Sequence, residues 1–560
     1  MAFQLSPGVN VSEVDLTTVV PSVATTVGGF AGNFNWGPVD EIVTINNEVQ
    51  LVEKFGKPDS NTYTSFFTSA NFLSYGNDLR VVRSVGNSAN NATTSGVAIR
   101  IDNRTDYEQN HSNGSVTDVF AAKYPGSLGN SIKVSMCDAN NELYSTWQYA
   151  SLFDSQANTS TYATSKGSSF DEIHVVVIDK TGKISGTANT VLEKFEFLSK
   201  AGDAKNEDGS TNYYKDVINS RSKYIWWLGH PSGMSDFGLN AADTASGGGY
   251  EILTTTDYEL SGGIDAVPSN GNLTTSYNLF DNPDSVDVSL IMAGALTGDT
   301  VADALVTLAE NRKDVLVFFS PQLNDVVNNS GSEASDIVTY RNTITSSSFA
   351  VMDSGWKYQY DKYNDVYRWV PLNGDVAGLC ARTDLERDPW FSPAGFNRGQ
   401  IKNVVKLAWN PTKAERDTLY KSGVNPVVTF PGEGTVLYGD KTLLSRPSAF
   451  DRINVRRLFI VLEKAIARAA RSSLFEFNDE FTRAQFVNLV EPFLRDVQGR
   501  RGIYDYRVVC DTTNNTPEVI DRNEFVGDIY IKPARSINFI QLNFVAVRTG
   551  VSFNEVVGSF

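Results

Sequence analysis

The stretch that decides the fold runs from residue 284 to residue 321. It contains DSVDVSLIMAG (284–294), VADALVTLAENR (301–312) and DVLVFFSP (314–321). The first and third pieces are apolar runs typical of buried strands, and the middle piece carries apolar residues at helical spacing. A buried strand, a helix and a second buried strand in succession favour a parallel pair with a helical crossover. The sequence therefore predicts an α/β sheet here.

A second α/β block precedes this stretch at residues 41–85. EIVTI (41–45) reads as a strand, residues 47–55 as a helix, TSFFTSANFLSYG (64–76) as another helix and DLRVVRSV (78–85) as a strand. Because the two blocks are far apart in the chain, we expect one discontinuous middle domain, formed by 23–86 plus 250–410, with a mixed sheet.

The region between the blocks has a different composition. Residues 87–249 are rich in Asn, Ser, Thr, Gly and Asp, with short strands such as 173–179 and a turn at 181–183. This pattern predicts an inserted outer domain that is rich in loops and β structure and faces solvent.

The last part of the chain, 411–560, predicts an α+β domain. Asn410, Pro411 and Gly423 have the types expected at the start and end of a helix. Residues 451–471 form an amphipathic helix, whose apolar stripe consists of Val455, Leu458, Phe459, Leu462, Ala465, Ile466 and Ala469. Strands follow in IYDYRVVC (503–510), FVGDIYI (525–531) and SINFIQLNFVAV (536–547).

Four cations occupy the opposite side of the 451–471 helix. At about 100° per residue, Arg457, Lys464, Arg468 and Arg471 lie within roughly 60° of one another and about 140° from the apolar stripe. A solvated helix face and a basic ridge that docks an acidic partner both fit this arrangement.

The first 22 residues read as an extended arm. Pro7 and Gly8 open it, and Val9, Val11 and Val14 are β-formers with polar residues between them. No partner hairpin lies beside the arm in the sequence. Its backbone N–H and C=O groups would be satisfied by docking on the sheet edge of a neighbouring molecule.

The charge of the chain restricts its partners. The net charge is -17, but from Cys380 onward there are 25 Lys and Arg against 21 Asp and Glu, so the preceding part carries -17 - (25 - 21) = -21. Such an acidic body repels nucleic acid and anionic membranes. The chain also lacks a long apolar run and a signal-peptide pattern, so we expect no nucleic acid partner, no membrane insertion and a cytoplasmic site of synthesis.

The sequence offers little equipment for catalysis. The three cysteines (Cys137, Cys380, Cys510) are widely spaced, which predicts buried free thiols, and the three histidines lie far from one another. PGEGTVLYG (431–439) lacks the spacing of a phosphate-binding loop, and Asp281, Asp284 and Asp287 lack the pattern of a calcium loop, so we interpret them as a loop and an acidic turn. We expect no catalytic, cofactor or metal site and no enzyme.

Several long segments resemble the tail sheath proteins of contractile-tailed bacteriophages. These segments are LSPGVNVSEVD (5–15), GNFNWGPVDEIVTINNEVQLVEKFG (32–56), NFLSYGNDLRVVRSV (71–85), KYQYDKYNDVYRWVPLNGDVAGLCARTD (357–384), SPAGFNRGQI (392–401), VLYGDKT (436–442), SAFDRINVRRLF (448–459), YRVVCDTTNNTPEVIDRNEF (506–525) and PARSINFIQLNFVA (533–546). The segments occur in order at both ends of the chain, and the region 87–249 shows little of the resemblance.

The resemblance implies an architecture and a function. Both chain ends would fold together as an inner domain, and subunits would stack as hexameric rings around a tail tube that contraction drives through the host envelope. Arms from neighbouring subunits would add strands to the inner sheet, through Pro7, Gly8, Val9, Val11, Glu13, Val14, Ile537, Phe539, Ile540, Leu542 and Phe544. Arg457, Lys464, Arg468 and Arg471 would face the tube. The implied partners are further copies of the chain, the tail tube protein, and baseplate and tail terminator proteins, and the implied location is the virion after assembly in the host cytoplasm.

Three alternatives remain at this stage. The first is the sheath of a related contractile injection or secretion particle. The second is a hydrolase housed in the α/β part, with the insertion as substrate domain. The third is a host-recognition module within the insertion.

Overall fold

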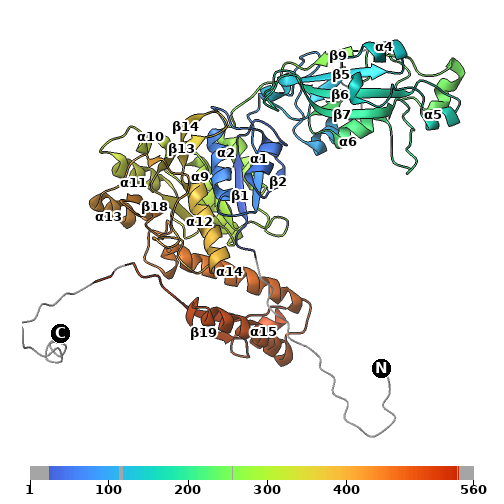
Figure 1. Cartoon of the computed structure of the whole chain (residues 1–560). Helices are drawn as coiled ribbons and strands as arrows, with labels where there is room; N and C mark the ends of the chain where they lie inside the picture. The colour runs from blue at the N-terminus through green and yellow to red at the C-terminus, as the bar shows by residue number, and fades with distance from the viewer. Residues whose placement is uncertain (1–23, 113–117, 255, 539, 542–560) are drawn as a thin grey trace, which may run out of the picture. The chain divides into compact units, whose positions relative to one another are not determined.

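A computed structural model describes residues 24–112, 118–254, 256–538 and 540–541 (Figure 1). It separates into two compact units, the larger ending at Leu474 and the smaller beginning at Phe475. The sequence instead places the start of the last domain at residue 411. The difference arises because residues 411–474 supply three strands and two α-helices to the larger unit.

The centre of the larger unit is a seven-stranded sheet assembled from both α/β blocks. Its order is β16 (Val424–Asn425), β12 (Ala350–Asp353), β11 (Leu316–Phe319), β10 (Leu290–Met292), β1 (Gly28–Gly32), β3 (Leu79–Arg83) and β2 (Ile42–Ile45). All neighbours are parallel except β2 and β3, which pair antiparallel. The predicted mixed sheet is confirmed, and its strands come from both α/β blocks.

Helices cover both faces of this sheet, so both faces are buried. Successive side chains of each strand point to opposite sides, and each strand therefore contributes to two cores. Leu316 and Phe318 of β11 join one hydrophobic core, whereas Val317 and Phe319 join the other. The first core is completed by α1 (Glu48–Phe55), α2 (Tyr63–Leu73), α12 (Asn373–Glu386) and α14 (Ile453–Ala470). The second is completed by α8 (Asn270–Asn278), α9 (Thr300–Arg312), α10 (Leu323–Val326), α11 (Glu333–Thr343) and α13 (Lys413–Lys421).

The ends of two helices show how local chemistry sets their bounds. The side chain of Asn47 caps α1 by accepting a hydrogen bond from Gln50 N. Helix α13 is capped by Thr412, in a capping box with Glu415, so the expectation that Asn410 caps this helix is wrong. Instead, Asn410 Oδ1 accepts a hydrogen bond from Thr429 N at 2.9 Å, and Asn410 Nδ2 donates one to Thr429 O at 3.1 Å.

Two smaller sheets also belong to the larger unit. One has the order β14 (Val366–Pro371), β13 (Trp356–Asp361), β15 (Lys406–Leu407), and the other is the hairpin of β17 (Val427–Phe430) and β18 (Gly434–Leu437). The expectation of a loop at 431–439 is therefore wrong for 434–437. Val436 and Leu437 are fully buried, which favours a strand over a solvated loop.

The insertion has two antiparallel sheets and cores of its own. The larger sheet has the order β7 (Thr190–Ser199), β6 (Glu172–Asp179), β5 (Ile132–Asp138), β9 (Thr256–Glu259), and the smaller pairs β4 (Phe120–Ala122) with β8 (Ile225–Trp227). Its helices are α3 (Arg104–Asp106), α4 (Asn141–Thr146), α5 (Thr161–Ser165), α6 (Tyr214–Arg221) and α7 (Ala241–Thr244). Because β9 pairs with β5, the inserted sheet extends beyond residue 249, where the sequence ends this domain.

The smaller unit is an α+β structure. Helix α15 (Glu480–Gly499) begins at the capping side chain of Asp479 and packs on β19 (Ile503–Val509), which pairs antiparallel with β20 (Asp528–Pro533). A short helix, α16 (Pro517–Asp521), lies between the two strands in sequence. The predicted participation of residues 1–22 in this domain lies outside the described residues.

Candidate inter-subunit interface

The cations of α14 do not form one exposed ridge. Only 3% of Arg457 is exposed. Its neighbours from Ile453 to Leu458 are also buried, so the first turns of the helix are covered on all sides. The expectation that Arg457 shares a solvent-facing surface with the other three cations is therefore wrong. Whether Lys464, Arg468 and Arg471 contact a tube stays a prediction.

Arg457 instead belongs to a buried contact at the root of the amino-terminal arm. Its guanidinium forms an ion pair with Asp384 of α12 and donates to Cys380 O at 3.2 Å. The same carboxylate oxygen of Asp384 accepts a hydrogen bond from Thr25 Oγ1 at 2.5 Å. Burial raises the pKa of the Asp384 carboxyl, and Arg457 opposes that rise. The Arg457–Asp384 pair thus ties Thr25, just before β1, to α12 and α14.

A second contact holds the preceding residue. Lys464 Nζ forms an ion pair with Asp287 and lies 3.5 Å from both Ala24 O and Ser289 Oγ. Ser289 Oγ also donates to Ala24 O, at 3.2 Å. We call Ala24, Thr25, Asp384, Arg457 and Lys464 the arm-root clamp. It fixes the last residues before β1 to α14 and α12.

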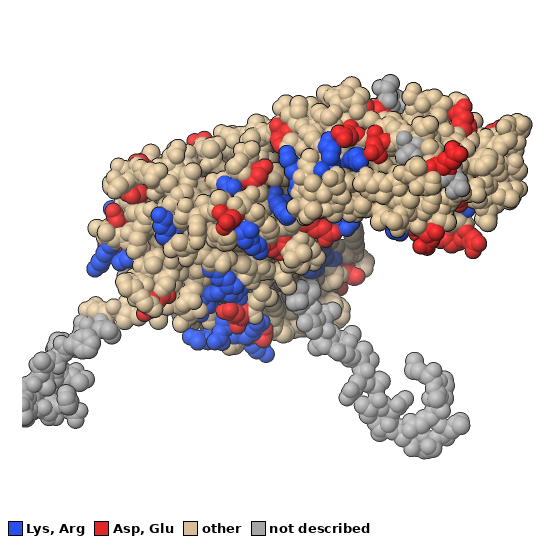
Figure 2. All heavy atoms as spheres, turned by 45° about the horizontal axis from the view of Figure 1, so that its top comes forward, with Lys and Arg blue, Asp and Glu red and all other residues tan. Residues whose placement is uncertain are grey.

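Arg468 of α14 and Arg471, which directly follows the helix, lie against the acidic turn that the sequence singles out. Arg468 lies 3.6 Å from Asp287, and Arg471 lies 2.6 Å from Asp284 in a pair whose side chains are 68% and 70% exposed. Figure 2 likewise shows basic and acidic side chains intermixed over much of the face in view. The cations of α14 are thus paired with carboxylates of the same chain.

The β19–β20 hairpin offers the backbone edges that strand exchange requires. Its ladder runs from Ile503 opposite Pro533 to Val509 opposite Asp528, with a bulge after Ile503. Among the described residues, no third strand pairs with either outer edge. An isolated pair of strands is marginally stable, and its free N–H and C=O groups are a template for added strands.

One face of the β19–β20 pair packs against α15 through β19, and the other face is largely exposed. Tyr506 and Val508 lie on the side of α15, where Tyr506 Oη donates to Glu491 O at 3.3 Å, yet both side chains remain partly exposed. Tyr504 and Tyr530 are 67% and 61% exposed. The core of the smaller unit is therefore incompletely covered by its own described residues.

The residues predicted to exchange strands are only partly described. Pro7, Gly8, Val9, Val11, Glu13, Val14, Phe539, Leu542 and Phe544 lie outside the described residues. Ile537 and Ile540 follow β20, are not part of a strand, and are 81% and 78% exposed. These two large apolar side chains have little cover within the described part of the subunit.

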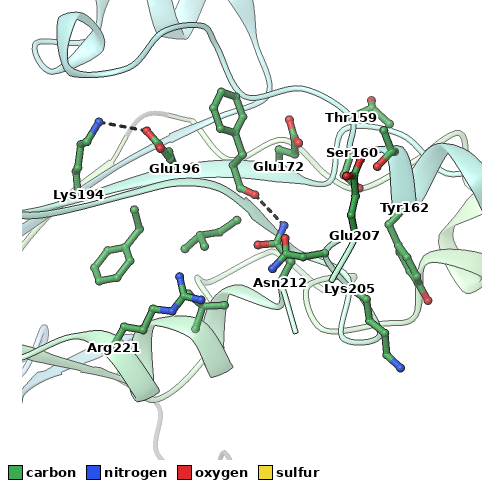
Figure 3. Close-up of a pocket in the computed structure, with 16 residues that line it drawn as sticks. Thr159, Ser160, Tyr162, Glu172, Lys194, Glu196, Lys205, Glu207, Asn212 and Arg221 are labelled. Carbon is green, nitrogen blue, oxygen red and sulfur yellow. Dashed lines mark hydrogen bonds and ion pairs between the residues drawn. The ribbon is translucent and has the colours of Figure 1, made fainter. Parts of the chain in front are cut away.

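A separate groove of about 550 Å³ lies on the insertion (Figure 3). Its walls carry cations and carboxylates together, including a Lys194–Glu196 pair at 3.2 Å, and Asn212 Nδ2 donates to Phe197 O at 2.9 Å. Sequence reasoning missed this groove because its lining comes from segments spread between residues 159 and 221. The mixture of charges favours no single ligand class, and host recognition by the insertion stays a prediction.

Other candidate chemistry is limited within the described part of the chain. No group of three or more His, Cys, Asp or Glu side chains is placed to hold a metal ion there. All three cysteines are buried thiols, as the sequence predicts. No helix among the described residues has the length and apolar content to cross a membrane.

Comparison with known proteins identifies the family. Family models match for the phage tail sheath protein central domain at residues 271–443, the phage tail sheath C-terminal domain at 445–546 and the tail sheath domain III N-terminal region at 25–83. The tail sheath protein of Enterobacteria phage T4 is 36% identical, with 99% of each chain covered.

Solved structures show the same fold at lower identity. A sheath tail protein from Listeria innocua has a TM-score of 0.54 at 13% identity, covering 91% of this chain and 96% of that one. The sheath of an extracellular contractile injection system in its contracted state has a TM-score of 0.50 at 14% identity, covering 97% and 98%. The chain belongs to the phage tail sheath protein family.

Proposed function

We propose that this chain is the structural subunit of a contractile phage tail sheath. Copies stack as hexameric rings around a tail tube, and contraction of the sheath drives the tube through the host envelope. Its partners are other copies, the tube protein, and baseplate and tail terminator proteins. It is assembled in the host cytoplasm and does no catalysis of its own.

The observation that carries this proposal is the open β19–β20 hairpin. Residues 1–22 and the residues after β20 are rich in β-formers, and an extended segment added to either edge of the hairpin satisfies the backbone groups of both partners. Strand addition between subunits keeps rings connected while they move. The exposed Ile537 and Ile540 become covered in the same step.

Contraction then needs only rigid subunits and flexible connections. The extended sheath is a metastable packing, and contraction docks the same subunits into better-matched interfaces, with the arms as hinges. The arm-root clamp defines where such a hinge ends, because Ala24 and Thr25 are fixed to the larger unit. A gain of a few kcal/mol per subunit suffices when many subunits move together.

Electron microscopy of the purified full-length chain tests the proposal. We expect long, striated, hollow tubes with six-fold symmetry, alone or after addition of the tube protein. A chain that remains monomeric at high concentration with its tube protein present would contradict the proposal. Turnover on a hydrolase substrate panel by such a monomer would favour the enzyme alternative.

The two ends of the insertion lie close together, so a short linker can replace the insertion. Gly86 N donates to Ala266 O at 2.9 Å, which joins the two ends. Replacing residues 87–265 by two glycines removes β9 together with the sheet to which it belongs. We expect a folded chain that still forms tubes, with a lower melting temperature because Trp36 is uncovered and Arg83 loses its bond to Pro125 O. Differential scanning calorimetry and microscopy check both points; a folded monomer without tubes would place the insertion in the lattice.

A further inference from the structure

The charges of the smaller unit are sorted along α15. Residues 476–483 and 510–528 contain eight Asp and Glu against two Arg. Residues 495–505 and 532–538 contain five Lys and Arg against two Asp. We call the first set the acidic end and the second set the basic end, because each set lies at one end of the helix.

Contacts within the unit hold each set beside its end of the helix. Asn478 Nδ2, just before α15 begins, donates to Glu524 O at 2.8 Å. Gly502, three residues after α15, accepts a hydrogen bond from Ala534 N at 3.1 Å. At about 1.5 Å per residue, the helix spans roughly 28 Å between these ends. That separation is several times the screening length of about 8 Å in physiological salt, so neither end neutralises the other.

The cations of the basic end outnumber the carboxylates that could pair with them. Asp496 and Asp505 already form ion pairs within this end. Three exposed cations form no ion pair with any described residue, namely Arg495, Arg501 and Arg535. At the acidic end, the exposed Glu518 and Asp521 likewise have no cation partner among the described residues. Both ends therefore present charge that the unit leaves unmatched.

The helix itself accounts for only part of this separation. Carboxylates near the start of a helix and cations near its end interact favourably with the helix dipole, which fits Glu480 and Arg495. Glu518, Asp521 and Arg535 lie outside α15, yet each has the sign found at the nearer end of the helix. The two ends are thus complementary surfaces on one unit. A contact of this head-to-tail kind can repeat from copy to copy around a ring.

We propose that the acidic end of one copy of this chain binds the basic end of the next copy, as a contact separate from strand exchange at the edges of β19–β20. The inference rests on the proposed self-assembly and adds a direction to it. Backbone pairing satisfies N–H and C=O groups whatever the side chains are, whereas opposite charges select which end of a neighbour is accepted.

Two charge variants of the full-length chain test this contact. Arg495→Glu with Arg535→Glu removes the positive charge of the basic end, and Glu476→Lys, Glu518→Lys and Asp521→Lys together neutralise the acidic end. Because each variant has lost one of the two matching surfaces, each alone is expected to polymerise only at a concentration raised roughly tenfold or more. Their melting temperatures should stay nearly normal, since every substituted side chain is exposed.

A mixture of the two variants gives a sharper readout. Each variant still carries the end that the other lacks, so at a concentration where neither associates alone we expect a complex of one copy of each. Sedimentation velocity detects this complex, and added salt should weaken it. Lys183→Glu with Lys205→Glu makes the same change in net charge on the insertion as the basic-end variant, and this control is expected to polymerise normally.

The outcomes separate this contact from the proposed function. Polymerisation of either variant at the normal concentration would overturn the inference and leave the proposed function intact. The absence of a mixed complex would overturn it as well, because the charged ends would then serve another partner. An unmodified chain that never self-associates would contradict the proposed function itself.

Discussion

A chain that lacks residues 1–20 is expected to be a folded, soluble monomer that forms no connected tubes. The arm-root clamp and every described element remain in this variant, so the larger unit keeps its stability. What is lost is the strand that we propose each copy gives to a neighbour, and without it the edges of the β19–β20 pair would remain unpaired between copies. Sedimentation velocity measures the loss of polymer, and circular dichroism with thermal melting measures retention of the fold.

Point variants separate the arm's strand character from its length. Val9→Asp with Val11→Asp places charges on the apolar face of the arm and is expected to act like the deletion. Asn10→Asp with Ser12→Asp puts the same charges at the polar positions and should leave polymerisation nearly normal, since successive strand residues face opposite sides. Normal tubes from the truncated chain would show that strand exchange through the arm is wrong.

Replacing Arg457 by alanine is expected to destabilise the larger unit by about 3–5 kcal/mol, because it leaves the buried Asp384 carboxylate without its cation. Arg471→Ala is the matched control on the same helix. It removes an exposed pair with Asp284 and is expected to cost about 0–1 kcal/mol. Urea unfolding of both variants, followed by tryptophan fluorescence, measures the difference.

A double variant identifies the cause of that loss. Arg457→Met alone keeps an apolar stem but still leaves Asp384 unpaired, so it should be nearly as unstable as the alanine variant. Adding Asp384→Leu removes the orphaned charge and is expected to recover most of the stability. Equal, small effects of Arg457→Ala and Arg471→Ala would contradict the buried position of Arg457.

Local patterns in the sequence were sufficient for much of the middle domain. The runs that became β10 and β11 are apolar at every position, which fits strands covered on both faces, and the helix between them begins and ends within a residue of its expected bounds. The start of α13 is different, because Thr412 caps the helix in a capping box with Glu415 and the predicted cap, Asn410, does not.

The candidate site was less accessible, because its contacts join distant segments. A helical projection treats α14 as one cylinder with one apolar side, whereas the first turns of the helix are buried all round. The buried Asp384 carboxylate needs a cation there, and Arg457 supplies it. The sequence indicates the acidic turn and the cation row separately, but nothing local indicates that Asp287 meets Lys464. Likewise, the strands β19 and β20 could be predicted, but not that their outer edges stay open among the described residues.

The place of β1 in the sheet has a mechanical consequence. The arm joins the larger unit through Ala24 and Thr25, a few residues before Gly28, where β1 begins between β10 and β3. A pull on the arm is first resisted by the side chains of α12 and α14 and then acts on a strand paired along both edges. That strand can leave only if two parallel ladders break together. In the proposed sheath, tension on the arm would therefore be borne by the arm-root clamp and these two ladders before it unravels the subunit.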